Sequence, residues 1–204
     1  MPLLTFAVVG EVLMSQVDEI LAFWFEQPNA ADYGKQRTFW FTKSPEIDRE
    51  ICERFLSDYE QAATHQLSSW QESPRNCLAL ILLLDQFPRN IFRGTPKAFA
   101  TDAAALSTAQ HAVAQGFDRE LLNVQRWFVY LPFEHSENLE HQRQCVELFA
   151  SLKDDPESAS AIDYAQRHLA VIERFGRFPH RNEILGREST PEEIEFLQQP
   201  GSSF

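Results

Sequence analysis

The sequence predicts an all-α domain of stacked antiparallel helix pairs, with about eight to ten helices joined by short loops. Three observations lead to this fold class. Proline stands where helices would begin or end, and apolar residues recur at helical spacing between those points. The chain also lacks Asn-Gly and Asp-Gly turns and any sustained alternation of apolar and polar residues, so hairpins are not expected.

Helix starts are predicted where proline follows a residue that can cap a helix. Proline suits the first helical turn, because its missing N–H would have no partner there and its φ is already helical. The preceding Ser, Thr or Asp can accept a hydrogen bond from the exposed amides. This pattern predicts starts at Ser44-Pro45, Ser73-Pro74, Thr95-Pro96, Asp155-Pro156 and Thr190-Pro191.

Other prolines follow apolar runs, where they predict helix ends. These are Phe87-Pro88, Leu131-Pro132 and Phe178-Pro179. Apolar stripes then predict helices over 45–65, 136–152 and 156–175, the last ending at Gly176. The run from Leu78 to Leu84 is apolar on every face, so we expect a central, buried helix there.

Composition limits the classes of function. The 204-residue chain carries a net charge of −12, which argues against nonspecific nucleic-acid binding and against docking on anionic membranes. The 3 cysteines are widely spaced and predict reduced thiols in a cytoplasmic protein, with no zinc site and no cofactor. We expect residues 1–13 to lie outside the core fold and residues 14–204 to form one helical domain.

A first polar patch follows the apolar run and begins at Asp85. A carboxylate in this position is expected to be buried, so it needs a charge partner or several donors. Arg89 or a more distant arginine can supply that partner and lock a helix–loop corner. Asp85 is also a candidate catalytic group, and Arg89 and Asn90 are candidate ligand-binding residues.

A second patch holds His135, Ser136, Glu137 and His141. Ser136 is predicted to cap the next helix, which places Glu137 and His141 at i and i+4 on it. Spacing positions only these two as ligands, too few for a metal site, so no metal is expected. His135 and Glu137 remain candidate catalytic residues.

A third patch gathers Arg177, His180, Arg181 and Asn182 in an otherwise acidic chain. Arginine forks match carboxylates and phosphates, so these residues are candidates for an anion pocket, with His180 also a catalytic candidate. The alternative is structural, with the arginines pairing with Asp85, Glu134 or Glu137.

Several long segments resemble one uncharacterised bacterial family, the domain of unknown function 924. They are FWF at 23–25 and at 39–41, LDQFPRNIFRGTPKAFATDAAAL at 84–106, YLPFEHSENLEHQ at 130–142 and RFGRFPHRNEILGREST at 174–190. The similarity extends from about Val17 to the C-terminus. The resemblance implies a tetratricopeptide-like helical fold and no assigned activity.

Three functions fit these observations. The first is a helical binding module with an Arg/His-lined pocket for an anionic small molecule or peptide group. The second is an enzyme that uses His/carboxylate acid–base chemistry in the same pocket. The third is a purely structural or interaction protein, in which the patches lock the fold. The sequence leaves the oligomeric state open.

Overall fold

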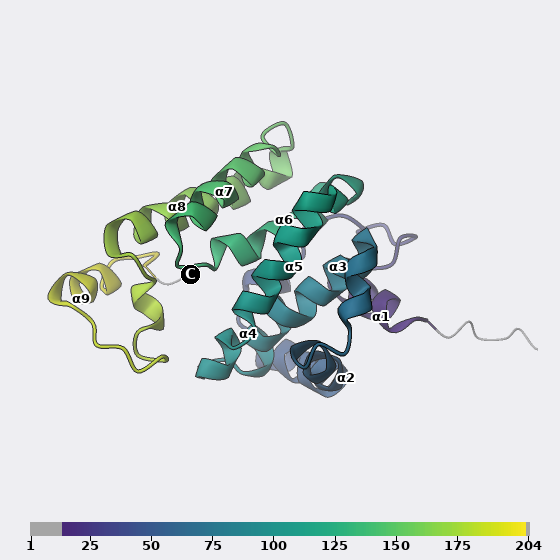
Figure 1. Ribbon diagram of the computed structural model, residues 1–204, viewed down its shortest axis with the longest axis horizontal. Helices are drawn as coiled ribbons and strands as arrows, with labels where there is room; N and C mark the ends of the chain where they lie inside the picture. Colours follow the sequence, from purple (N-terminus) through teal and green to yellow (C-terminus); the bar gives the residue numbers. More distant parts are fainter. Residues whose placement is uncertain (1–13, 203–204) are drawn as a thin grey trace, which may run out of the picture.

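The computed structural model describes residues 14–202, and the part it describes is helical with no strand, so the all-α prediction is confirmed. The predicted extension 1–13 lies outside the described residues. Stacked helix pairs make up the fold (Figure 1), while its tetratricopeptide-like character stays a prediction. The α-helices are α1 (Gln16–Phe25), α2 (Pro45–Ala63), α3 (Pro74–Ile81), α4 (Phe87–Ile91), α5 (Asp102–Gln115), α6 (Asn123–Glu134), α7 (Leu139–Ala150), α8 (Ala159–Phe175) and α9 (Pro191–Leu197).

The main hydrophobic core lies mostly between helices α1 to α6 and is rich in aromatic rings. Trp24 meets the ring of Phe39 at 5.3 Å and that of Phe128 at 5.6 Å, both edge to face. Edge-to-face pairs are favourable beyond the apolar area they bury. The run from Leu78 to Leu84 is fully buried at the centre of this core, as the sequence predicts.

The predicted proline starts are found in the structure, though not all begin α-helices. Ser44 caps α2 and Thr190 caps α9, where Thr190 and Glu193 form a reciprocal capping box. Pro74 begins α3. Pro96 and Pro156 instead begin short 3₁₀ turns, Pro96–Phe99 and Pro156–Ser158, and α8 starts only at Ala159.

The helix end predicted at Phe87-Pro88 is wrong. The chain stays helical from α3 through a π-helical turn, Leu82–Gln86, into α4. In that turn the Phe87 N–H bonds to the Leu82 carbonyl, five residues back. Such a wide turn places Pro88 in the first turn of a new α-helical segment, where its missing N–H costs little.

Two predictions near residue 135 also need correction. Pro132 lies inside α6, which continues to Glu134, so it does not end the helix. Ser136 does not cap α7. Asn138 does, accepting the N–H groups of Glu140 and His141, while the Ser136 hydroxyl bonds to His141 Nδ1 at 2.9 Å.

Beyond α6 the chain forms a separate layer. Helices α7 and α8 lie side by side, and the C-terminal segment (residues 176–202, with α9) lies at the end of the molecule opposite α1 (Figure 1). Its small hydrophobic cluster consists of Val171, Ile172 and Phe178 with their partly buried neighbours. No described helix is long and apolar enough to cross a membrane.

Candidate functional site

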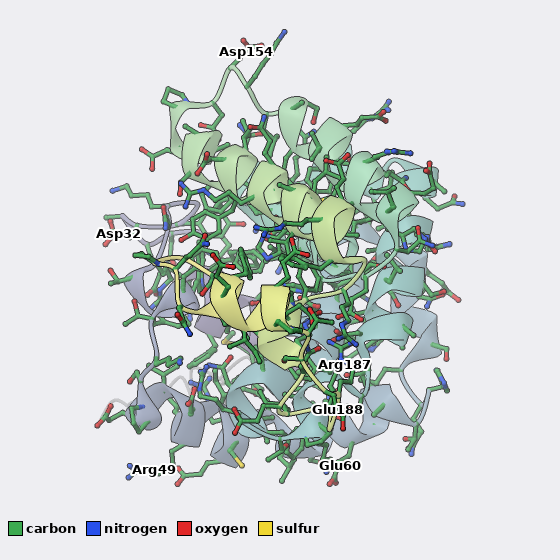
Figure 2. All side chains as sticks on the ribbon, turned by 90° about the vertical axis from the view of Figure 1, so that its left-hand side faces the viewer. Asp32, Arg49, Glu60, Asp154, Arg187 and Glu188 are labelled. Carbon is green, nitrogen blue, oxygen red and sulfur yellow. The ribbon has the colours of Figure 1, made fainter. Side chains whose placement is uncertain are left out.

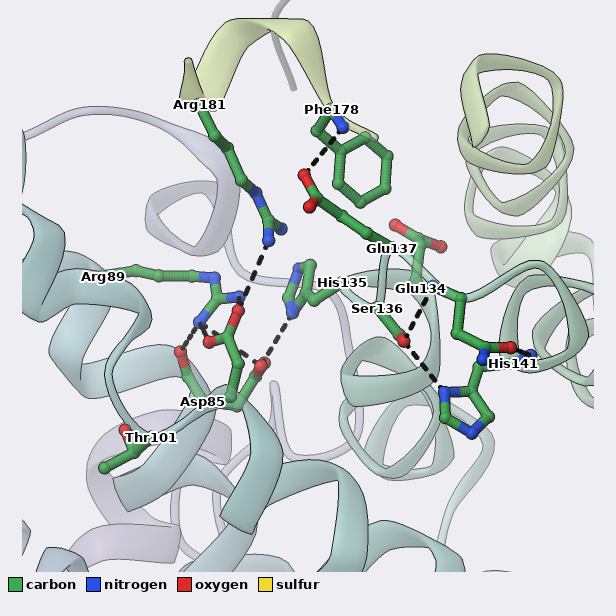
Figure 3. Close-up of polar contacts among 12 residues, drawn as sticks. Asp85, Arg89, Thr101, Glu134, His135, Ser136, Glu137, His141, Phe178 and Arg181 are labelled. Carbon is green, nitrogen blue, oxygen red and sulfur yellow. Dashed lines mark hydrogen bonds and ion pairs between the residues drawn. The ribbon is translucent and has the colours of Figure 1, made fainter. Parts of the chain in front are cut away.

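The candidate site begins at Asp85, in the π-helical turn between α3 and α4. Its side chain is fully buried, and its Oδ1 lies 2.7 Å from His135 Nδ1 at the end of α6 (Figure 3). Burial alone would raise the pKa of Asp85, but the charge of Arg89 and contacts with His135 and Gln86 outweigh burial and lower it to about 2. Asp85 is therefore a carboxylate.

Arg89 joins the first patch to α5. One turn after Asp85, its Nη1 lies 3.3 Å from the Asp85 carboxylate. The two Nη groups of Arg89 also donate to Asp102, at 3.0 and 3.2 Å. This two-pronged contact holds both side chains in fixed orientations. From the third patch, Arg181 reaches the same Asp102 carboxylate at 3.4 Å.

We define the polar cluster as Asp85, Arg89, Asp102, His135 and Arg181. Patches far apart in the sequence come together here. The turn after α3, the start of α5 and the end of α6 meet beneath the 3₁₀ turn Pro179–Arg181, which carries Arg181. In Figure 3, the second ring nitrogen of His135 faces away from Asp85, on the side of Arg181.

Arg181 is the unusual member of the cluster. It is only 7% exposed, and its guanidinium carbon lies 4.8 Å and 4.7 Å from the ring centres of Phe99 and Phe178. Its Nε is buried without a hydrogen-bond partner among the described residues. Burial and the nearby charge of Arg89 lower the pKa of Arg181 to about 10. The group is still a cation at neutral pH.

His135 is held as a neutral imidazole. Burial, reinforced by the charge of Arg89, lowers the pKa of His135 despite the opposing effect of Asp85. The imidazole is therefore neutral at pH 7. With Asp85 ionised, Nδ1 carries the hydrogen of the 2.7 Å bond, which leaves a lone pair on Nε2. Burial and Arg181 lower the pKa of His180 to about 4, so that ring is also neutral.

A second buried pair lies beside the cluster. Glu134 Oε1 is 3.4 Å from Nδ1 of His168 on α8, and both residues are 4% exposed. Burial, and then the charge of Asp85, raise the pKa of Glu134 to about 8, while burial lowers that of His168 to about 3. Both groups are therefore mainly neutral at pH 7, and Glu134 holds a proton.

Glu137 is fully occupied by contacts with the C-terminal segment. It accepts the Phe178 N–H at 2.8 Å and both Nη groups of Arg187 at 2.7 and 3.0 Å. The placement of Glu137 with His141 on one helix is wrong, because Glu137 precedes α7 and points toward Phe178 (Figure 3). These contacts place Glu137 in a supporting position.

Other predicted site residues lie in structural contacts away from the cluster. Asn90 donates to Asp48 at 2.8 Å. Arg177 donates two hydrogen bonds to the Glu193 carboxylate, from Nε at 2.6 Å and from Nη2 at 2.8 Å. Asn182 donates to Ser189 and to the same Glu193. These bonds hold α2 to α4 and fold the C-terminal segment onto itself.

The structure adds three site residues that the sequence analysis did not name: Asp102, His168 and Arg187. Glu134 was named there only as a possible partner of the arginines, and the structure pairs it with His168 instead. Only His168 carries a local signal, since it stands on the buried face of an amphipathic helix. The others have ordinary positions in the sequence, and only tertiary packing shows their role.

The cluster offers an anion contact and a proton acceptor. Arg181 supplies the first, and the Nε2 lone pair of His135 supplies the second. No group of three or more His, Cys, Asp or Glu side chains suited to a metal ion occurs among residues 14–202. A hollow of about 140 Å³ lies elsewhere, between α3 and α5, and is lined by Leu80, Leu84 and Thr108 among others.

Comparisons with known proteins agree with the resemblance noted in the sequence. The family described as "Bacterial protein of unknown function (DUF924)" matches residues 20–201. A solved structure of a protein of unknown function, ATU0120 from Agrobacterium tumefaciens, is 38% identical. It superposes with a TM-score of 0.80, covering 89% of this chain and 96% of that one. No curated protein matches the sequence.

Proposed function

The chain belongs to this family of bacterial proteins of unknown function, and from its polar cluster we propose that it binds an anionic group through Arg181. The ligand is a carboxylate or phosphate carried by a small molecule or a peptide. The observation that carries the proposal is an arginine that is more than nine-tenths buried. Within the described part of the chain, its Nε has no hydrogen-bond partner and its one ion pair is long, at 3.4 Å.

Charge pairing supports an anion at this position. Asp85 and Asp102 both contact Arg89, and Asp102 faces Arg89 at 3.0 Å but Arg181 at 3.4 Å. Glu137 is committed to Arg187. Among residues 14–202, Arg181 therefore has no carboxylate of its own, although burying a charge without a close partner is costly. A bound anion would supply the missing charge and the hydrogen-bond acceptor.

The test is calorimetric titration of the protein with inorganic phosphate and with acetate, supported by thermal unfolding. A ligand at 100 times its Kd stabilises the folded state by about 2.7 kcal/mol. We expect the wild type to bind at least one of the two anions and Arg181→Gln to lose that binding.

Arg174→Gln is the matched control, since Arg174 pairs with Glu192 on the surface and makes no ion pair with the polar cluster. Arg174→Gln should bind as the wild type does. If Arg181→Gln binds both anions as tightly as the wild type, or if neither anion binds the wild type, the proposal is wrong.

A second candidate function is an enzyme that uses acid–base chemistry, favoured by the 2.7 Å contact between Asp85 and His135. In this candidate Arg181 binds an anionic substrate, and His135 Nε2 removes a proton from it. Asp85 fixes the tautomer of the imidazole and stabilises the charge that His135 acquires.

Incubation with a bacterial small-molecule extract, followed by mass spectrometry, distinguishes the two candidates. For an enzyme, a compound consumed by the wild type should survive with His135→Gln, while anion binding is retained. A wild type that binds anions but consumes nothing supports the binding module. The cytoplasmic location, expected from the cysteines, stays a prediction.

A further inference from the structure

We propose that residues 177–202, which carry Arg181, form a gate over the other members of the polar cluster, that Glu137 is its latch, and that the gate opens to admit the anion. This inference rests on the proposed function, because it explains how a ligand reaches an arginine that is only 7% exposed. Figure 2 shows the C-terminal segment lying across this face of the molecule, with α9 in the foreground.

The latch is a compact set of hydrogen bonds. Glu137, in the loop between α6 and α7, accepts hydrogen bonds from the Phe178 N–H at 2.8 Å and from the two Nη groups of Arg187 at 2.7 and 3.0 Å. Arg187 also donates to the Phe178 carbonyl at 3.0 Å. One carboxylate therefore fixes two points of the gate, one near its start and one in the loop before α9.

Little apolar packing holds the gate elsewhere. The small hydrophobic cluster beneath it contains three buried residues, Val171, Ile172 and Phe178, and only Phe178 belongs to the gate. Phe196 of α9 packs at its edge against Phe175, with ring centres 5.0 Å apart. Segments with few buried apolar contacts open at a lower free energy than the core does.

The gate has a hinge and an internal structure of its own. Gly176 ends α8 with φ 67°, and a Cβ built on it would meet no atom within 4 Å. Within the gate, Arg177 and Asn182 both donate to Glu193, which also accepts the N–H of Thr190, the N-cap of α9. Because these contacts lie inside the segment, it can move as a unit about Gly176.

Two contacts of different length hold the gate over the cluster. The Arg181–Asp102 pair, at 3.4 Å, is longer than the Arg187–Glu137 pair, at 2.7 Å. Release of Glu137 would lift Arg181 from Asp102 and expose His135 and Arg89. Closing would then place the Arg181 guanidinium on an anion bound beside His135.

Hydrogen exchange measured by mass spectrometry tests the gate without a ligand. We expect Glu137→Gln to speed exchange in peptides covering 178–189 at least tenfold, with no change in peptides from α3. Arg187→Gln breaks the same latch from its other side and should give the same result. Glu140→Gln removes a carboxylate from an exposed pair with Arg143 within α7, away from the gate, and should leave exchange unchanged.

The gate is refuted if neither latch variant speeds exchange in 178–189, or if exchange rises equally in α3, which would mean global destabilisation. Inorganic phosphate then tests the link to the proposed function. It should slow exchange of 178–189 in the wild type and not in Arg181→Gln. Latch variants that open the segment while phosphate has no effect on the wild type would support the gate and refute phosphate as its ligand.

Discussion

The two ends of this molecule are held together by different physical forces. Around α1 to α6, a continuous apolar core packs aromatic rings such as Trp24, Phe87 and Phe128 against one another. The C-terminal segment has a small apolar cluster and is held to the rest of the molecule by arginine–carboxylate contacts, Arg181 with Asp102 and Arg187 with Glu137. Apolar packing is non-directional and strong, whereas the polar contacts depend on geometry and on charge state. We therefore expect the apolar core to provide most of the stability of the fold, and the C-terminal segment to be the part that moves when a ligand binds.

The largest effect is expected for Phe128→Ala in the apolar core. Phe128 is fully buried and its ring meets those of Trp24, Phe25 and Trp40. Truncating such a ring costs about 3–5 kcal/mol, which corresponds to a fall in Tm of about 6–20 °C for a domain of this size. Phe41→Ala is the control, because Phe41 is 60% exposed. Thermal unfolding of both variants checks the prediction, and equal losses would contradict it.

Asp85→Asn should lower the free energy of unfolding by about 3 kcal/mol, somewhat less than Phe128→Ala, since Arg89 loses one carboxylate partner but keeps Asp102. The effect depends on pH. The pKa of Asp85 is lowered to about 2 in the fold, so its stabilisation is complete above the ordinary value of 3.8. It is lost as the pH falls toward 2. The difference in unfolding free energy between the wild type and the variant should therefore be smaller at pH 2.5 than at pH 7. An equal difference at both pH values would show that the ionised Asp85 carboxylate is not the source of the stabilisation.

Glu134→Gln should increase stability at alkaline pH. Because burial raises the pKa of Glu134 to about 8, the folded state disfavours its ionised form, and the wild type loses stability between pH 4.5 and about pH 8. The variant avoids that loss. The unfolding free energy of the variant relative to the wild type should therefore rise from pH 5 to pH 8, by at most about 1.4 kcal/mol per pH unit. Glu140→Gln, at an exposed position, serves as the control. An advantage that is the same at pH 5 and pH 8 would exclude titration of Glu134.

The smallest effect is expected for Arg177→Gln. Arg177 is partly exposed, so its contact with Glu193 is screened by water, and Glu193 keeps its bonds to Asn182 and the Thr190 N–H. We expect only a small fall in Tm, of at most about 2–4 °C. Phosphate or acetate binding should be unchanged. A loss of binding with no loss of stability would place Arg177 in the ligand site.

The sequence predicts the fold well because its strongest signals are local. Pro45 and Pro191 start helices since capping depends on a few neighbouring residues. The continuation of the helix through Pro88 could not be predicted, because the π-helical turn before it depends on the packing of α3 and α4.

The candidate site was predicted only in part. The run of apolar residues before Asp85 correctly indicates a buried carboxylate, and His135 and Arg181 were candidates beside it. The choice among the arginines could not be made from sequence. Arg177 and Arg181 stand in the same motif, yet Arg177 has a dedicated carboxylate and Arg181 does not. Only the tertiary structure separates them.

The central claim is that the guanidinium of Arg181 binds an anion. The most direct measurement is the NMR signal of the Arg181 Nε–H group during titration with inorganic phosphate and with acetate, assigned by its loss in Arg181→Gln. Because this Nε has no hydrogen-bond partner among residues 14–202, we predict a saturable shift of the signal with one of these anions. An Arg181 signal that does not move while those of exposed arginines do would contradict the claim.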